Sequence, residues 1–206
     1  MEINRTGGQL LIEALQQQGT DHIFCVPGES FLSALDSLHS VESIRTVICR
    51  HEGGAAMMAD AYGKLTHRPG VCFVSRGPGA SNAASGIHIA SQDSTPLVMF
   101  VGQIERATTG REAFQEVDYK AMFGYAAKRV EQIEDVDRIP EVVSRAFHTA
   151  VNGRAGPVVV ALPEDMLRDT TAAQPVALFR RVEPAPVAAA VAEFEERLKA
   201  ARKPIM

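Results

Sequence analysis

The sequence predicts an α/β protein with three layers, α/β/α, around a six-stranded, mostly parallel sheet. Two observations carry this prediction. Short apolar runs alternate along the chain with longer segments in which apolar residues recur at helical spacing. The short runs are apolar on both faces, as in strands that helices cover on both sides. Such alternation implies right-handed crossovers between parallel strands.

The first half of the chain predicts three strands, each joined to helices. Thr6 is expected to cap a first helix that ends at Gly19, and Ser30 is expected to cap a second. The expected strands are His22–Val26, Ile44–Cys49 and Val71–Ser75, and two further expected helices are Gly54–Leu65 and Pro78–Ser91.

The second half predicts three more strands, at Leu97–Val101, Ala126–Val130 and Pro157–Leu162. An amphipathic helix is expected over Asp135–Val151. The segment Gly102–Gly124 is irregular and long for a plain connection, which is typical of a functional loop.

A change of composition after Pro163 divides the chain. Residues 1–168 are expected to form one domain, and residues 169–186, rich in Thr, Ala, Pro and Arg, predict an extended linker. Residues 187–206 predict the start of another domain, a helix with Val191, Phe194 and Leu198 on one face. Because the sequence stops where a new apolar run would begin, we expect a fragment of a longer protein.

The composition excludes several classes of protein. The 206 residues carry a formal net charge of −4 with both signs mixed, so no binding surface for nucleic acid or an anionic membrane is predicted. No apolar run is long enough to cross a bilayer, and the N-terminus lacks an apolar signal region. Cys25, Cys49 and Cys72 lie in apolar runs and predict buried free thiols of a cytoplasmic protein.

Glu52 is the leading candidate for a functional residue. It follows a predicted strand, at the edge where parallel sheets place their ligands, and small side chains surround it. Loops at residues 26–30 and 75–82 follow two other strands and reach the same edge. Taken alone, Glu52 is better explained as an acid that favours the positive end of a helix dipole.

Other motifs have ordinary explanations beside functional ones. Gly77-Pro78-Gly79 at a helix start could cradle a phosphate, but no G-x-G-x-x-G and no Walker lysine accompanies it, which disfavours a nucleotide-binding domain. The serines lack a G-x-S-x-G elbow, and His51 and His88 lack zinc spacing, so no metal site is predicted. The pair Phe114-Gln115 could line a pocket or anchor the long loop.

Seven ordered motifs carry a resemblance to a known family. They are Val26-Pro27-Gly28, Arg50-His51-Glu52, Gly77-Pro78-Gly79-Ala80-Ser81-Asn82, Asp93-Ser94 with Pro96, Gly102-Gln103, Ala113-Phe114-Gln115-Glu116 and Gly156-Pro157-Val158. In this order they resemble the N-terminal, pyrimidine-binding domain of thiamine-diphosphate-dependent enzymes over residues 5–165. Within that family the chain is most similar to acetolactate synthase and its relatives among 2-oxo-acid decarboxylases and carboligases.

The resemblance implies a role for each matching residue. Glu52 would hydrogen-bond N1′ of the aminopyrimidine of thiamine diphosphate and activate the cofactor, which makes it a catalytic residue together with Gln115. Phe114 and Gln115 would face the arriving substrate, a 2-oxo acid such as pyruvate. The cofactor site as a whole would comprise Val26, Pro27, Gly28, Glu52, Pro78, Gly79, Asn82 and Gln115.

The resemblance also implies a missing half. In the family, Mg²⁺ and the diphosphate bind a separate C-terminal domain, and the active site forms between subunits of a dimer or tetramer. We therefore expect this chain to be inactive alone and to have an apolar partner-facing surface. Gly53 and Arg76 depart from the family pattern, so the product is left open, as is a requirement for FAD. Two alternatives are a small subunit of a split decarboxylase and a non-catalytic assembly module on the same fold.

Overall fold

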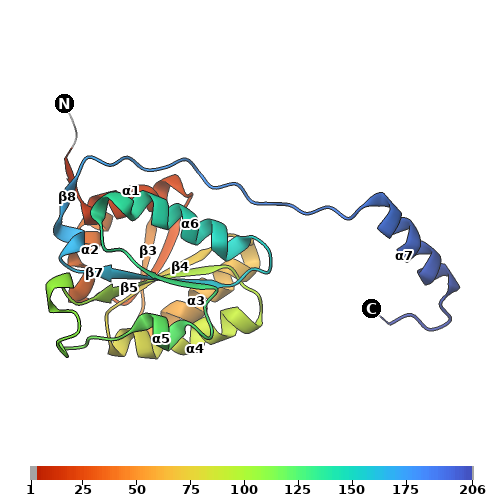
Figure 1. Cartoon of the computed structure of the whole chain (residues 1–206), viewed down its shortest axis with the longest axis horizontal. Helices are drawn as coiled ribbons and strands as arrows, with labels where there is room; N and C mark the ends of the chain where they lie inside the picture. Colours follow the sequence, from red (N-terminus) through yellow and green to blue (C-terminus); the bar gives the residue numbers. More distant parts are fainter. Residues whose placement is uncertain (1–3, 206) are drawn as a thin grey trace.

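The computed structural model describes residues 4–205, so the first three residues of the expected first domain and the last residue of the chain lie outside it. Six parallel strands form the central sheet, in the order β3-β2-β4-β5-β7-β6. Helices α1, α2 and α6 cover one face of this sheet, and α3, α4 and α5 cover the other (Figure 1). The predicted three-layer fold is confirmed.

The strands and helices have the following bounds. The strands are β1 (Arg5–Thr6), β2 (His22–Cys25), β3 (Arg45–Ile48), β4 (Gly70–Val74), β5 (Leu97–Gln103), β6 (Arg129–Gln132), β7 (Pro157–Pro163) and β8 (Thr170–Thr171). The helices are α1 (Gly7–Gln17), α2 (Leu32–His39), α3 (Glu52–Thr66), α4 (Pro78–Gln92), α5 (Tyr119–Phe123), α6 (Ile139–Val151) and α7 (Ala188–Ala200).

The central strands explain the stability of the sheet. Every residue of β4, β5 and β7 is buried, which accounts for their continuously apolar sequences. Alternate side chains enter two separate cores, one on each face. On the α1 side, the rings of Phe73 and Phe100 stack with centroids 4.9 Å apart, and Phe31 packs 5.7 Å from Phe73.

The predicted cap of helix α1 is correct, whereas the predicted cap of helix α2 is not. Thr6 caps α1 as expected, accepting a hydrogen bond from the backbone N–H of Gln9. The prediction that Ser30 caps the second helix is wrong, because residues 29–31 form a 3₁₀ turn and α2 begins after Phe31. The Ser30 hydroxyl is buried instead, 3.1 Å from the hydroxyl of Ser75.

The order of the strands creates a topological switch point at one edge of the sheet. From β2, the chain adds β3 on one side of the sheet and β4 on the other, so the connections leave in opposite directions. Ligands of open parallel sheets bind outside the carboxyl ends of the strands at such a switch point. The loops that follow β2, β3 and β4 all open onto this edge.

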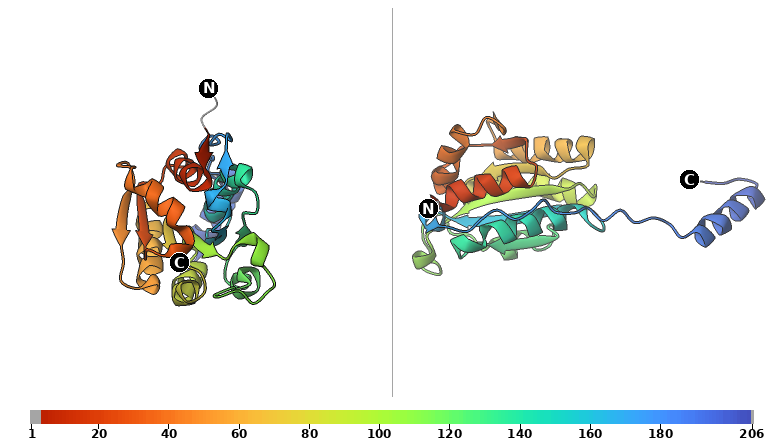
Figure 2. Two further views of the ribbon diagram at one scale, coloured as in Figure 1. Left: turned by 90° about the vertical axis from the view of Figure 1, so that its left-hand side faces the viewer. Right: turned by 90° about the horizontal axis from the view of Figure 1, so that it is seen from above.

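The chain turns back across the domain after β7. Strand β8 pairs antiparallel with β1, with Arg5 opposite Thr171. Residues 172–182, which we call the strap, then run along the outer side of α1 and α6 (Figure 2). After the strap, α7 stands away from the domain with every residue exposed (Figure 1).

Side-chain amides hold the strap in place. The Gln18 amide donates to the carbonyls of Val176 and Ala177, each at 3.2 Å, and accepts from the N–H of Phe179 at 3.0 Å. Asn152 accepts from the N–H of Val182 at 2.6 Å. These hydrogen bonds attach the strap to the ends of α1 and α6.

The remaining expectations concern the edges and surface. Strand β6 begins three residues later than expected, at Arg129, and the short helix α5 lies inside the segment expected to be irregular. Within residues 4–205, no helix is long and apolar enough to span a membrane. Exposed apolar side chains gather on α3, where Met57, Met58 and Leu65 are 44%, 41% and 84% exposed.

Candidate functional site

Glu52 is the first residue of α3, directly after β3. Its Oε2 accepts a hydrogen bond from the Asn82 amide at 2.9 Å, and the side chain is otherwise half-exposed. The ring of His51 caps the helix by accepting from the N–H of Gly53 at 3.1 Å. The helix starts two residues before the predicted Gly54, so Glu52 is fixed by regular backbone rather than by a loop.

Three glycines lie where the loops around Glu52 approach each other. A Cβ on Gly28 would lie 2.7 Å from the Cβ of Ser75, so only hydrogen fits between these loops. Gly77 has φ +62° and precedes Pro78, the first residue of α4. A Cβ placed on Gly79 would lie 3.4 Å from Oε1 of Glu52, which puts that carboxylate directly against the start of α4.

The long loop after β5 reaches the same edge. The Cβ of Gln115 would lie 2.9 Å from a Cβ on Gly77, and Gln115 itself has φ +65°. The Glu116 carboxylate holds the loop by accepting from the N–H groups of Gly110 at 2.6 Å and Ala113 at 3.1 Å. Phe114 is 76% exposed, so it does not anchor the loop in the core.

The predicted site residues are brought together to different degrees. Glu52, Gly79 and Asn82 touch one another, and Gly28 and Gln115 lie against the neighbouring turn. Val26 and Pro27 lead from β2 into the Gly28 loop. Among the described residues, no hydrogen bond joins Gln115 to Glu52, and Phe114 points to solvent rather than into a formed pocket.

The sequence did not predict the roles of three residues at this edge, which are Ser30, Ser75 and Tyr119. Tyr119 is buried, accepts from the N–H of Gly77 at 3.1 Å and donates to the carbonyl of Gly102 at 2.9 Å. Burial raises the pKa of Tyr119 to about 12, so the phenol stays protonated and keeps both bonds. The hydrogen-bond partners that reveal these roles are distant in sequence and leave no local pattern.

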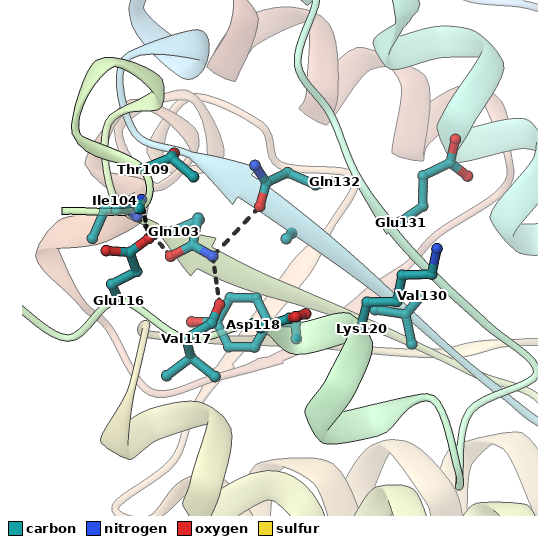
Figure 3. A pocket seen from close by; sticks show the side chains of 13 residues that line it. Gln103, Ile104, Thr109, Glu116, Val117, Asp118, Lys120, Val130, Glu131 and Gln132 are labelled. Atoms are coloured by element: carbon teal, nitrogen blue, oxygen red, sulfur yellow. Dashed lines mark hydrogen bonds between the residues drawn. The ribbon is translucent and has the colours of Figure 1, made fainter. Parts of the chain in front are cut away.

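A separate cavity of about 380 Å³ lies at the other half of the carboxyl edge (Figure 3). Gln103, Val117 and Gln132 line it, at the ends of β5 and β6 and in the long loop. The Gln103 amide donates to the Val117 carbonyl at 2.9 Å, which uses its polar group for the loop. Its lining residues do not include Glu52, so this cavity is not the site that the sequence predicts.

The cysteines do not offer a nucleophile. Cys25, Cys49 and Cys72 are all buried and free, as predicted. Burial raises the pKa of all three thiols, that of Cys25 to about 12, so none is a thiolate near neutral pH. Within residues 4–205, no cluster of His, Cys, Asp and Glu could hold a metal ion.

An α/β/α domain with a parallel central sheet and a carboxylate at its switch point is typical of a domain that binds a cofactor. Residues 5–122 match the thiamine pyrophosphate enzyme family, N-terminal TPP binding domain, and the chain belongs to this family. This finding confirms the resemblance drawn from the seven motifs.

Relatives of known name narrow the comparison. The chain is 39% identical over 166 residues to the acetolactate synthase large subunit of Lactococcus lactis subsp. lactis (strain IL1403), which covers 81% of this chain and 29% of that protein. It is 40% identical over 162 residues to the acetolactate synthase isozyme 3 large subunit of Escherichia coli (strain K12), which covers 79% of this chain and 28% of that protein. Acetolactate synthase 3, chloroplastic, of Brassica napus is 39% identical over 162 residues, 79% of this chain and 25% of the relative. The chain thus spans between 25% and 29% of the length of these relatives.

Proposed function

We propose that this chain is the pyrimidine-binding part of a thiamine-diphosphate-dependent 2-oxo-acid carboligase or decarboxylase of the acetolactate synthase type. The observation that carries the proposal is the Glu52 carboxylate, which lies at the switch point against Gly79 and Asn82. Membership of the family and the names of the relatives support it.

The residues present fit an aminopyrimidine ring. A flat heterocycle needs closely spaced walls, and a Cβ would lie 2.7 Å from the Cβ of Ser75 if placed on Gly28 and 3.3 Å from it if placed on Gly79, so both loops pack closely around the turn after β4. It also needs a polar group at its edge, and Glu52 supplies a carboxyl with one oxygen held by Asn82. Among these residues, Val26, Pro27, Gly28, Pro78, Gly79 and Asn82 would shape the slot.

The chain's own contribution to the chemistry is proton handling and positioning. Thiamine diphosphate, when bound, supplies the electron sink for releasing carbon dioxide from a 2-oxo acid. Glu52 would hold or release a proton at N1′ of the pyrimidine, and Asn82 would keep the carboxyl oriented by its hydrogen bond. Gln115, beside Gly77, would orient the substrate, with the exposed Phe114 at the entrance.

We infer that the other half of the site lies outside this chain. The matched segment covers only 29% of the Lactococcus lactis relative and 25% of the Brassica napus relative, which leaves room for a domain that holds Mg²⁺ and the diphosphate. The exposed apolar side chains on α3, a helix that carries Glu52 at its start, support contact with that domain or with a second subunit in a dimer or tetramer. On this proposal the chain alone binds the cofactor weakly and does not turn over pyruvate.

Titration of the chain with thiamine diphosphate tests the proposal. We expect the backbone amide signals of Gly28, Gly53 and Gly79 to shift in NMR spectra. Glu52→Gln should weaken binding by about tenfold, since a hydrogen bond to a charged group is lost. Glu42→Gln, an exposed carboxylate in the loop before β3, is the matched control and should bind normally. If Glu52→Gln showed the same chemical-shift changes and the same affinity for thiamine diphosphate as wild type, the assignment of Glu52 would be contradicted.

A further inference from the structure

Arg76 joins three loops at the carboxyl edge of the sheet. It follows β4 and stands directly before Gly77. Its Nη1 donates to Glu164, after β7, at 2.8 Å, and its Nη2 donates to Glu29, after β2, at 3.1 Å. The Arg76 side chain is only 11% exposed, so this charge is nearly removed from water.

The backbone of Arg76 is held as firmly as its side chain. Its N–H donates to the buried hydroxyl of Ser30 at 3.2 Å, and that hydroxyl lies 3.1 Å from the hydroxyl of Ser75. On the other side, Tyr119 accepts from the N–H of Gly77. The turn after β4 is therefore fixed both to the loop after β2 and to the long loop after β5.

The charge pattern shows which contact is strongest. Glu164 is 26% exposed, whereas Glu29 is 68% exposed, so the Arg76–Glu164 pair is the better shielded from solvent. A buried guanidinium needs such partners, because an unpaired buried charge is strongly destabilising. Its Nε has no hydrogen-bond partner among the described residues, so the carboxylates of Glu29 and Glu164 alone pair with the charge of the guanidinium.

We infer that Arg76, paired with Glu164, is a positioning residue for the cofactor slot. Arg76 ties the Gly77-Pro78-Gly79 turn to the Gly28 loop, because its Nη2 donates to Glu29 and its N–H donates to Ser30, while Glu164 after β7 holds the guanidinium in place. The Gly28 loop and this turn would form the two walls of the slot. The guanidinium of Arg76 reaches both the loop after β2 and the loop after β7, which a small side chain at this position could not do. This inference rests on the proposed function, since the walls matter only if a ring enters between them.

Four variants of the 206-residue chain test the inference. Arg76→Met removes the charge, Glu164→Gln removes the shielded partner, and Arg76→Lys keeps the charge without the planar fork that reaches two carboxylates. Arg145→Met is the matched control, because Arg145 also pairs with two carboxylates, Glu131 and Glu141, but on helix α6, which packs on the face opposite to Glu52's helix. Thermal unfolding measures the stability of each.

Two readouts separate positioning from general stability. The first is the amide hydrogen exchange of Gly28 and Gly77, and the second is affinity for thiamine diphosphate by NMR titration. Arg76→Met and Glu164→Gln should speed exchange at both glycines and weaken binding by about tenfold. Arg76→Lys should keep part of both, because the charge remains, and Arg145→Met should change neither, even at an equal loss of thermal stability.

The outcomes are distinguishable from a failure of the proposed function. Unchanged exchange at Gly28 and Gly77 in Arg76→Met would overturn the positioning role, as would equal loss of binding in Arg145→Met. If wild-type chain shows no thiamine diphosphate shifts at any concentration, the proposed function fails, and the positioning role for a cofactor slot falls with it. Faster exchange without weaker binding would reduce Arg76 to a structural residue and contradict the inference.

Discussion

Glu52 and Asp21 are carboxylates at opposite edges of the same parallel sheet. Glu52, after β3, has one polar partner, the Asn82 amide at 2.9 Å. Asp21, before β2, has three, accepting from Tyr62 at 2.6 Å and Arg68 at 2.9 Å and lying 2.9 Å from the ring of His22. The carboxyl edge leaves a charged oxygen open to a ligand, whereas the amino edge uses its charges internally.

This difference teaches how one sheet separates stability from function. At the amino edge, the Asp21 contacts tie the start of β2 to the end of α3, and the Gln18 amide holds the strap. At the carboxyl edge, Glu52 keeps a single polar partner, and the loops beside it meet in close contacts at glycine. Changes to the Asp21 and Gln18 contacts should therefore alter unfolding, and a change to Glu52 should alter binding or catalysis.

The largest effect is expected for Glu52→Gln in the whole enzyme that contains this chain. Loss of a group that exchanges a proton with the cofactor should lower kcat by about 10²–10⁴-fold. Melting temperature should stay close to that of wild type, because Glu52 has a single partner. Steady-state assays with pyruvate, with and without added FAD, measure kcat, and calorimetry measures the melting temperature. Near-normal kcat would remove Glu52 from the catalytic role.

Gly77→Ala should produce the next largest effect. Gly77 has φ +62°, and a Cβ there would lie 2.9 Å from the Cβ of Gln115, so alanine strains both backbone and loop. We expect a loss of about 1–3 kcal/mol in urea unfolding. Gly54→Ala is the control, since nothing lies within 4 Å of its Cβ position in α3. Equal stability of the two variants would contradict the strain.

Gln18→Ala tests the attachment of the strap. The variant leaves two strap carbonyls and the N–H of Phe179 to solvent, which should cost about 1 kcal/mol and speed exchange of the Phe179 amide. Cofactor binding should be unchanged, because Gln18 lies at the amino edge. The exposed neighbour Gln17 provides the control variant Gln17→Ala. Protection of Phe179 in Gln18→Ala would show that the amide does not hold the strap.

Asp21→Asn should have the smallest effect, and the effect should depend on pH. Burial alone would raise the pKa of Asp21, but hydrogen bonds from Tyr62, His22 and Arg68 lower it from 3.8 to about 2. The carboxylate therefore stabilises the fold above pH 3.8, and this contribution disappears as pH falls towards about 2. Because the side chain is 45% exposed, we expect less than about 1 kcal/mol.

Urea unfolding of Asp21→Asn at neutral and acidic pH provides the measurement. The difference from wild type should be present at neutral pH and vanish near the acid end of that range. Asp36→Asn, an exposed acid on α2, serves as the control. A difference that persists unchanged into acid would assign the effect to lost packing rather than to charge.

Local sequence was sufficient for most of the sheet and for the loops around Glu52. The apolar runs mark strands because β4, β5 and β7 are buried on both faces. The short edge strand β6 was misplaced by three residues, since its burial is only partial and its sequence mixes polar and apolar residues.

Contacts distant in sequence were beyond such reasoning. The Ser30 hydroxyl could have capped the helix that follows it, but in the folded domain it lies against the hydroxyl of Ser75. That contact depends on two loops meeting at the switch point, so the local sequence does not reveal it. The same holds for Arg76, whose partner Glu164 is 88 positions away. The strap has a composition typical of a flexible linker, yet Gln18 and Asn152 supply the hydrogen bonds that its backbone lacks.

The pairing of β1 with β8 has a consequence for how this domain is made. Arg5 faces Thr171, and the N–H of Gly7 donates to the carbonyl of Asp169 at 2.9 Å. During synthesis, β1 cannot pair with β8 until nearly the whole domain has left the ribosome. Closing so long a loop is slow and raises contact order, so the first residues translated are among the last to acquire native contacts.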